Sequence, residues 1–278
     1  MPARLLITGA ASGIGKELAS RAFVRGDRVF GADLSDAALA PPGAGAGFRA
    51  IRMDVADNDS VLAAFAEVDR ELGGEELSGV IHCAGVSPSG AFEVMPIEIF
   101  ERTMSINALG TARVMRAAIP RLRGHDGRLI LVSSVLGRIA NPMLAAYSGS
   151  KFAIEAYVDA ARRETRGMGL QITVVEPGVI RTPMLERQIA ESGNAARELE
   201  GAHQRHYGAL YRSHAALVAK GAARATSVER CAHEIERVFS AARAPARRPI
   251  GSDSRLGCVL ARALPDRVLD RLLASLLR

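Results

Sequence analysis

Short apolar runs alternate with longer amphipathic stretches along most of the chain, and this alternation constrains the fold more than any other feature. The short runs are typical of buried strands and cover Arg4–Ile7, Arg28–Ala32, Ala50–Met53, Gly79–Cys83, Arg128–Val132, Gln171–Val175 and Pro249–Ile250. The amphipathic stretches predict helices over Gly13–Val24, from Asp57 or Asn58 to Leu72, and over Pro96–Pro120, Ala145–Gly167, Thr226–Ala242 and Leu264–Leu277. Strands that alternate with helices indicate a parallel sheet covered on both faces, so we expect a doubly wound α/β fold.

The sequence shows no internal repeat and no linker long enough to divide it, so we expect one domain over residues 1–278. Pro41–Gly47 is rich in proline and glycine and predicts a surface loop. Residues 183–225 show no strand pattern and many polar and small residues. Residues 251–278 form a C-terminal extension that ends in a leucine-rich amphipathic helix.

The composition argues against several functional classes. The three cysteines form no CxxC pair, so neither a zinc site nor a disulfide framework is suggested. The first residues do not resemble a signal peptide, and no apolar stretch reaches the roughly 18 residues of a spanning helix. We therefore expect a cytoplasmic protein.

Most of the net charge of +6 lies near the C-terminus, where residues 224–278 hold eleven arginines and six acids. Such a segment can bind nucleic acid or an anionic membrane. Because no aromatic-rich basic motif or zinc finger accompanies it, we favour a solvated arginine-rich surface. We expect no nucleic-acid partner, and peripheral membrane contact is the less favoured alternative.

The glycine-rich segment Thr8–Gly15 lies between a predicted strand and a predicted helix. Glycines let the backbone turn tightly and approach a pyrophosphate, and the helix N-terminus supplies free N–H groups and a favourable dipole. An ordinary glycine-rich turn is the alternative, but the position at the start of an alternating chain favours a dinucleotide site. The residues expected to contact the cofactor here are Gly9, Ser12, Gly13, Ile14 and Gly15.

Asp33 ends the second predicted strand, 20 residues after Gly13. An acid at this place can bind the ribose hydroxyls of adenosine and would repel the additional phosphate of NADP. The glycine loop contains no arginine or lysine that would compensate, and Arg4 and Arg28 lie too early in the chain. We therefore expect NAD as the cofactor, with NADP less favoured. A residue that caps the next helix is the alternative interpretation of Asp33.

Tyr147 and Lys151 are four residues apart on a predicted helix and share one of its faces. A neighbouring ammonium, together with a cationic nicotinamide, would favour the phenolate and lower the pKa of the tyrosine. Alone, such a pair is common on helix surfaces. Ser134, however, ends a predicted strand thirteen residues before Tyr147, where a hydroxyl can bind a carbonyl oxygen.

Asn107 lies inside a predicted helix although asparagine is a mediocre helix former, so it is either a solvated residue or a functional one.

These motifs resemble the short-chain dehydrogenase/reductase family over residues 4–182. The family's order and spacing are matched by the glycine loop and by Asp33, Asp54, Val55, Ala84, Gly85, Asn107, Ser134, Tyr147, Lys151, Pro177, Gly178 and Thr182. The resemblance implies a Rossmann fold and an enzyme that interconverts a secondary alcohol and a ketone with a nicotinamide cofactor. It also implies a homodimer or homotetramer.

By this resemblance, Tyr147 would pass the proton and Ser134 would position the substrate oxygen. Lys151 would bind the nicotinamide ribose and tune Tyr147, and Asn107 would hold a water in the proton path.

Toward the cofactor, the resemblance implies that Asp54 binds the adenine and that Pro177–Thr182 lies against the nicotinamide carboxamide. One pair of residues departs from the family, which often has two asparagines where this chain has His82 and Cys83 before Ala84. We interpret His82 as a packed strand residue and Cys83 as a small core residue rather than a reactive thiol.

By the same resemblance, residues 183–225 form a substrate lid. Its apolar residues either line the pocket of a bulky hydrophobic substrate or only pack within the lid: Met184, Leu185, Ile189, Tyr207, Leu210, Tyr211 and Leu217. His203 and His206 have no carboxylate pattern beside them, so we expect no metal site.

The tail from Arg248 to Asp266 is similar to the C-terminal part of retinol- and hydroxysteroid-dehydrogenase-like members. This similarity favours steroids, retinoids or fatty alcohols as substrates. An NADPH-dependent reductase of 3-oxoacyl thioesters is the alternative enzyme. A nucleotide sensor without catalysis and a membrane-attached interaction protein are the alternatives outside enzymes.

The predicted terminal helix carries one apolar stripe, with Pro265 in its first turn. The stripe consists of Leu264, Val268, Leu269, Leu272, Leu273, Leu276 and Leu277. Such a stripe could be covered in three ways: by the core of the same subunit, by a subunit interface or by a membrane surface. We expect a soluble homo-oligomer in which this helix shields apolar surface near the lid.

Overall fold

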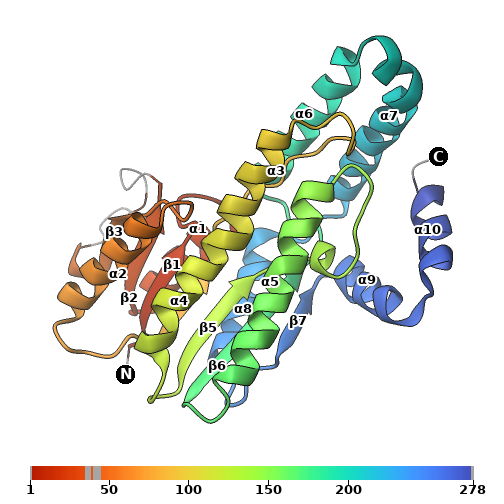
Figure 1. The fold of residues 1–278 in the computed structure, drawn as a ribbon. Coiled ribbons are helices and arrows are strands. Elements are labelled where there is room, and N and C mark those ends of the chain that lie inside the picture. The colour runs from red at the N-terminus through yellow and green to blue at the C-terminus, as the bar shows by residue number, and fades with distance from the viewer. Residues whose placement is uncertain (1, 35–38, 40–44, 277–278) are drawn as a thin grey trace.

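The computed structural model describes residues 2–34, 39 and 45–276. Its centre is a parallel sheet of seven strands in the order β3-β2-β1-β4-β5-β6-β7 (Figure 1). The strands are β1 (Arg4–Thr8), β2 (Arg28–Asp33), β3 (Phe48–Arg52), β4 (Gly79–His82), β5 (Gly127–Val132), β6 (Leu170–Pro177) and β7 (Arg247–Ile250). All seven predicted strands are present, with ends within two residues of those predicted. The predicted doubly wound α/β fold is confirmed.

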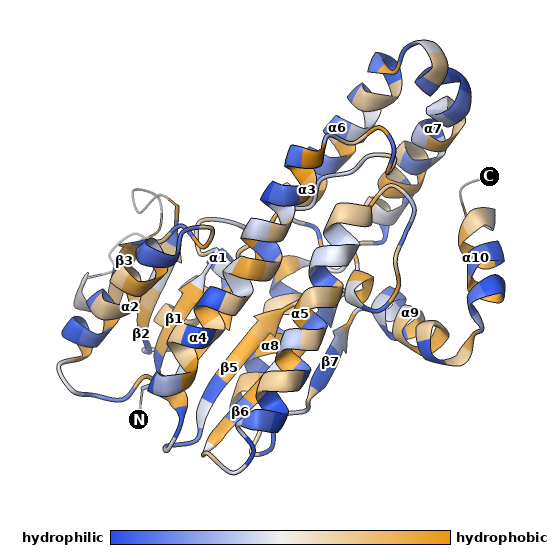
Figure 2. Ribbon diagram, in the orientation of Figure 1, coloured by the Kyte–Doolittle hydropathy of each residue, from blue (hydrophilic) through white to orange (hydrophobic). Residues whose placement is uncertain are grey.

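Helices cover both faces of the sheet. One face carries α2 (Asn58–Leu72), α4 (Gly110–Leu122) and α5 (Ala145–Glu164), and the other carries α1 (Gly13–Val24) and α8 (Val228–Ser240). Successive strand residues point to opposite faces, so Leu6 of β1 joins the first core while Leu5 and Ile7 join the second. Burial on both faces explains why the inner strands β1, β4, β5 and β6 are apolar along most of their length, whereas the edge strand β7 begins with two arginines (Figure 2).

The helix predicted from Pro96 to Pro120 is interrupted. It consists of α3 (Ile97–Thr103), one π-helical segment, η2 (Met104–Leu109), and α4. Single π-turns within α-helices are frequent at functional sites. Here the π-turn contains Asn107, whose backbone carbonyl accepts the Thr111 hydroxyl at 2.6 Å.

Residues 183–225, expected as a lid without strands, form two helices, α6 (Pro183–Glu198) and α7 (Gly201–Ala223). They pack on one another as a hairpin that projects beyond the sheet (Figure 1). Thr182 caps α6, because its hydroxyl accepts the Leu185 N–H at 3.4 Å, and Pro183 occupies the first helical position, where proline is favoured.

The C-terminal extension differs from its prediction. Directly after β7, Gly251 adopts a φ of +100° and the chain enters α9 (Ser252–Ala263), a helix that we did not predict. The terminal helix α10 (Asp266–Ser275) then begins after Pro265, so this proline precedes the helix instead of lying in its first turn. Within the described range, α10 has no buried residue, and it stands beside the body of the molecule (Figure 1).

Of the predicted loop Pro41–Gly47, residues 41–44 lie outside the described residues, and Gly45–Gly47 forms a single 3-10 turn. Among the helices that the structure describes, none combines the length and the apolar character needed to cross a bilayer.

Candidate active site

A cavity of about 790 Å³ lies at the carboxyl ends of the strands. The chain order of the strands reverses between β1 and β4, and open α/β sheets bind ligands at such a switch point. The ends of β1, β2, β4, β5 and β6 form its floor, and α6, α7, α9 and α10 contribute its outer wall. Its size is within the usual range for small-molecule sites.

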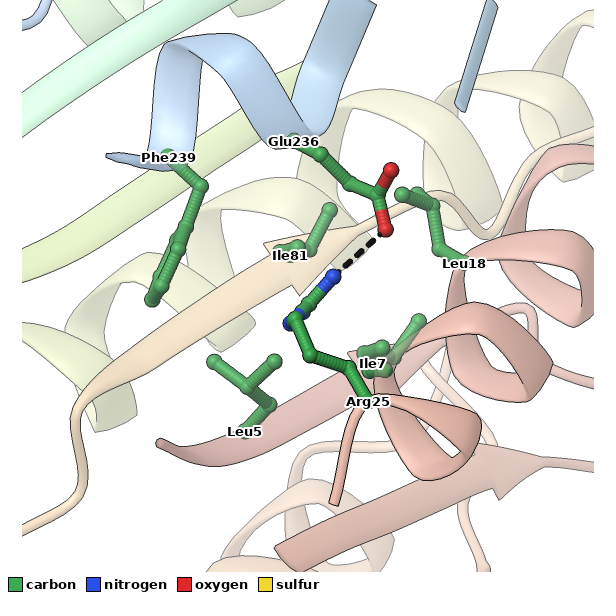
Figure 3. A pocket seen from close by; sticks show the side chains of 8 residues that line it. Leu5, Ile7, Leu18, Arg25, Ile81, Glu236 and Phe239 are labelled. Carbon is green, nitrogen blue, oxygen red and sulfur yellow. Dashed lines mark hydrogen bonds and ion pairs between the residues drawn. The ribbon is translucent and has the colours of Figure 1, made fainter. Parts of the chain in front are cut away.

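A much smaller gap lies between α1, α8 and the sheet (Figure 3). Its volume is about 10 Å³, and Leu5, Leu18 and Phe239 are among its walls. At its edge, Arg25 Nη1 donates to Glu236 Oε1 at 2.7 Å. A space of this size holds about one water molecule, so we regard it as a packing gap and not as a ligand site.

The glycine loop forms one end of the large cavity, and its backbone demands glycine. Gly9 and Gly13 have φ values of +69° and +54°, which disfavour a side chain. A Cβ at Gly9 would lie 2.8 Å from the Ala84 backbone nitrogen, and one at Gly15 would overlap the Gly9 carbonyl. The loop therefore packs tightly against β4 while its backbone faces the cavity, as a cradle for a pyrophosphate requires.

Asp33 lies beside this loop at the end of β2 and lines the cavity. One carboxylate oxygen accepts the Ala11 N–H at 3.0 Å and the other accepts the Leu34 N–H at 2.8 Å. Asp54 and Val55 line the next part of the wall, where Asp54 Oδ1 accepts the Ala56 N–H at 2.8 Å. Both acids are thus oriented by backbone donors and still border the cavity.

Ser134, Tyr147 and Lys151 lie together on the wall at the ends of β5 and α5. The Ser134 hydroxyl accepts the Leu136 N–H at 3.1 Å, which orients it. Lys151 Nζ donates to the Val132 carbonyl at 2.9 Å and lies 5.6 Å from the centre of the Tyr147 ring. The helical spacing and the strand end bring together the three groups that the sequence predicted.

The expected lowering of the Tyr147 pKa depends on a cationic nicotinamide as well as on Lys151, and it stays a prediction. Burial raises the pKa of Tyr147, and an interaction with the Ser134 hydroxyl opposes that rise. Burial also lowers the pKa of Lys151 to about 8. The Lys151 ammonium donates to the Val132 carbonyl, and burial is the largest cause of both pKa shifts.

Among the predicted catalytic and cofactor-binding residues, Asn107 alone does not line the cavity. It is fully buried behind Gly85. Its side-chain oxygen accepts the Val86 N–H at 2.8 Å, and its side-chain nitrogen donates to the Val86 carbonyl at 2.8 Å and to Ser150 Oγ at 2.9 Å. These bonds join the segment after β4 to α5, so the observed contacts position the wall rather than reach into the cavity.

His82 and Cys83 have the packing roles expected of them. His82 Nδ1 lies 2.7 Å from Thr8 Oγ1, and burial lowers the pKa of His82 to about 3. Burial likewise raises the pKa of the Cys83 thiol, which makes it a poor nucleophile. On α7, His203 and His206 are exposed, and the described part of the chain contains no cluster of three metal-ligating side chains.

The start of α9 contributes contacts that our sequence analysis missed. Asp253 Oδ2 accepts the Val179 N–H at 2.7 Å, and the Ser254 hydroxyl donates to the Glu176 carbonyl at 2.5 Å. Both bonds hold the segment around Pro177 and Gly178, which lines the cavity. The glycine before this helix was the available signal, since it allows the sharp turn out of β7.

Only three of the seven apolar lid residues named from the sequence line the cavity, namely Met184, Leu185 and Leu217. Tyr207, Leu210 and Tyr211 pack in a separate cluster with Ala91 and Met143. For these three residues the second alternative holds, because they pack with their neighbours and do not line the pocket. The tail supplies a further part of the apolar wall, through Leu256, Leu260, Leu272, Leu273 and Leu276.

Residues 3–193, more than half of the chain, match the family model described as short chain dehydrogenase. The chain belongs to the short-chain dehydrogenase family. Its match to the family includes the glycine loop, Ser134, Tyr147 and Lys151, and it ends within α6.

Two curated relatives define the likeness further. The 17-beta-hydroxysteroid dehydrogenase type 6 of Bos taurus is 35% identical over 187 residues, which are 66% of this chain and 59% of that protein. Retinol dehydrogenase 5 of Mus musculus is 32% identical over 284 aligned positions, 98% of this chain and 88% of that protein. The first likeness spans less than two thirds of the bovine protein, so it does not carry over the activity of the whole relative.

Two solved structures share the fold. A short-chain dehydrogenase/reductase from Burkholderia phymatum in complex with NAD superposes with a TM-score of 0.77 at 18% identity, covering 93% of this chain and 92% of that one. A short-chain dehydrogenase from Burkholderia cenocepacia in complex with NADP has a TM-score of 0.74 at 22% identity, covering 100% and 98%. The fold thus accommodates either cofactor.

Proposed function

We propose that this protein is an oxidoreductase that interconverts hydrophobic secondary alcohols and ketones with a nicotinamide cofactor. The observation that carries this proposal is the placement of Ser134, Tyr147 and Lys151 on one wall of the cavity whose other end is the glycine loop. A sensor without catalysis would not require these three groups. A membrane-attached interaction protein would not require the cavity.

The residues present fit a dinucleotide. The glycine loop leaves no space for a Cβ at Gly9 or Gly15 and exposes backbone to the cavity, which suits a pyrophosphate. Asp33 and Asp54 border the part of the cavity that would take the adenosine, and Gly178 and Thr182 border the part that would take the nicotinamide. A bound nicotinamide would accept or donate the hydride.

The chain itself handles the proton. The protonated Tyr147 hydroxyl can donate its proton to a ketone oxygen during reduction, which leaves a phenolate. In the oxidation direction the phenolate accepts the alcohol proton and the hydroxyl is restored. Ser134 offers a second donor to the same oxygen. Lys151, fixed on the Val132 carbonyl, lies close enough to the ring to stabilise the phenolate when it forms.

The substrate that fits best is bulky and apolar. The outer wall combines lid residues with leucines of α9 and α10, and such walls exclude water and bind lipophilic molecules. The curated relatives with hydroxysteroid and retinol in their names agree with this substrate class. We propose NAD over NADP, because Asp33 faces the cavity where the additional phosphate of NADP would lie. An NADPH-dependent reductase of 3-oxoacyl thioesters is the second candidate.

We also infer that the protein works as a cytoplasmic homodimer or homotetramer. This inference rests on the sequence resemblance and on the exposed apolar face of α10.

The deciding experiment is a screen of hydrophobic secondary alcohols with NAD and with NADP, followed by absorbance of the reduced nicotinamide. We expect turnover of steroid, retinoid or long-chain alcohols with NAD. Turnover restricted to 3-oxoacyl thioesters with NADPH would favour the second candidate. Binding of neither cofactor would refute the proposed function.

A further inference from the structure

The lid carries a buried histidine to which no role has been assigned. His214 lies on the inner face of α7, is 3% exposed, and lines the cavity. Its Nε2 is buried and has no hydrogen-bond partner among residues 2–34, 39 and 45–276. Buried polar groups nearly always have a partner, so an unpartnered one beside a cavity points to a ligand.

The polar neighbours of His214 have partners or are open to solvent, whereas His214 is not. Tyr211, one turn earlier on α7, is also buried, but its hydroxyl accepts the Ala91 N–H at 3.1 Å. Leu217 and Val218, one turn later, line the cavity and are apolar. On α6, Arg187 is exposed and Gln188 only half-buried, so both side chains are open to solvent. His214 is therefore a buried polar group on a mainly apolar stretch of wall.

The position of His214 along α7 separates it from the reaction centre. Gly221, seven residues further on, is where α7 meets the turn after β6, since a Cβ there would lie 3.7 Å from Val179. At a rise of about 1.5 Å per residue, His214 lies about 10 Å along the helix from that turn. His214 is thus separated by about 10 Å from the Pro177–Thr182 segment, which would lie against the nicotinamide.

The charge state of His214 restricts what it can bind. Burial lowers the pKa of His214, so the imidazole is neutral at neutral pH. A neutral imidazole offers one N–H donor and one lone pair. It suits a hydroxyl or ketone oxygen, and it provides no charge to pair with the carboxylate or phosphate of an acidic carrier group.

We propose that His214 binds a second oxygen of the substrate, a hydroxyl or ketone at the end remote from the reacting carbon. This inference rests on the proposed function and narrows its substrate class. A rigid apolar molecule with an oxygen at each end, such as a hydroxysteroid, can pack against the leucine wall and form a hydrogen bond with His214. A fatty alcohol or a retinoid with a single oxygen leaves the imidazole without a partner.

The test compares substrates that differ only in the remote oxygen. One pair is androstan-17-ol and 17-hydroxyandrostan-3-one, and the reversed pair is androstan-3-ol and 3-hydroxyandrostan-17-one. Values of kcat and KM with NAD are measured for wild type, His214→Leu and His214→Asn. His206→Leu, which changes an exposed histidine of the same helix, is the matched control. Equilibrium binding of the same compounds to the NAD-loaded chain is measured in parallel.

We expect His214→Leu to raise KM for the two-oxygen member of at least one pair about 10-fold. The change in kcat should be small, and KM for the one-oxygen partner should stay the same or fall. His214→Asn, which keeps an N–H donor, should restore part of the loss, and His206→Leu should have no effect.

An unchanged ratio of KM between the two members of both pairs in His214→Leu would overturn the inference. If wild type oxidises only the alcohols with one oxygen, the inference about His214 is overturned and the proposed function stays intact. If wild type oxidises no secondary alcohol, the proposed function fails, and the ratio of binding constants within each pair still decides the role of His214. Melting temperatures identify a variant that fails to fold.

Discussion

The segment up to Thr182 and the segment after it hold their cavity residues in different ways. In the first segment, backbone groups fix the side chains, as when the Val132 carbonyl holds Lys151 and the Ala11 N–H holds Asp33. In the second segment, the cavity wall consists of helices attached to the sheet, and α10 has no buried residue within the described range. The geometry of the chemistry is thus built into the sheet, while the shape of the substrate site depends on added helices.

This difference predicts a difference in the effects of mutation. Changes to the first segment should alter turnover, cofactor choice or the stability of the fold by large factors. Changes to the second should alter assembly and substrate preference while the chemistry continues.

The largest expected effect comes from Tyr147→Phe. The substitution removes the only proposed proton donor and keeps the ring, so turnover should fall by roughly 10²–10⁴-fold. NAD affinity, measured by titration, should change little. Tyr157→Phe, on the same helix and partly buried, is the matched control and should keep its rate. More than half of the wild-type rate in Tyr147→Phe would show that another group moves the proton.

The second largest effect concerns Lys151, which should make the free energy of unfolding depend on pH. Its pKa is lowered from 10.5 to about 8 by burial, so between these values the unfolded chain binds a proton that the folded chain has lost. Stability therefore rises with pH across this window and carries the full penalty of the buried charge below pH 8. Lys151→Met should be the more stable protein near neutral pH, and its advantage should shrink by up to about 3 kcal/mol as the pH rises.

Urea unfolding from pH 7 to 10 measures this difference. Lys16→Met, which changes an exposed lysine of α1, is the control and should show no such trend. A gap between Lys151→Met and wild type that is constant with pH would mean that the ammonium is well solvated.

A third effect concerns the choice of cofactor. Asp33→Ala removes the carboxylate that would bind the ribose hydroxyls, and Leu34→Arg adds a partner for a phosphate at an exposed neighbouring position. The double variant should shift the ratio of NADPH to NADH affinity by about 10- to 100-fold toward NADPH. Leu34→Arg alone is the control. If the ratio does not move, Asp33 does not face the ribose.

The same two segments explain what the sequence could and could not predict. Up to Thr182, strand positions and motif residues follow from local patterns, because strands buried on both faces are continuous apolar runs. The wall residues Ser134, Tyr147 and Lys151 were found because strand ends and helical spacing place side chains without reference to distant contacts.

Other features depend on tertiary contacts and were missed. Asn107 bonds to Val86 and Ser150, which are brought to it by the fold and not by spacing. The pKa of Tyr147 reflects its burial, which the helix pattern does not reveal. After Thr182, an apolar residue of a lid helix can face the cavity or the other helix, and period alone did not separate Leu217 from Leu210.

The smallest expected effect on stability is deletion of residues 264–278, because the described part of α10 has no buried residue in the single chain. If a partner subunit covers its leucines, the truncated protein should form smaller assemblies by light scattering, while the melting temperature falls by less than about 4 °C. Leu272→Ser with Leu276→Ser tests the same face in the intact chain, and both leucines also border the cavity.

The three ways of covering this helix give different results. A large fall in melting temperature with unchanged assembly would mean that α10 stabilises its own subunit. Loss of flotation with anionic vesicles, without a change of size in solution, would indicate a membrane surface. Unchanged size, melting temperature and activity would show that the helix is dispensable. The leucines of α10 that line the cavity would then contribute nothing to substrate binding.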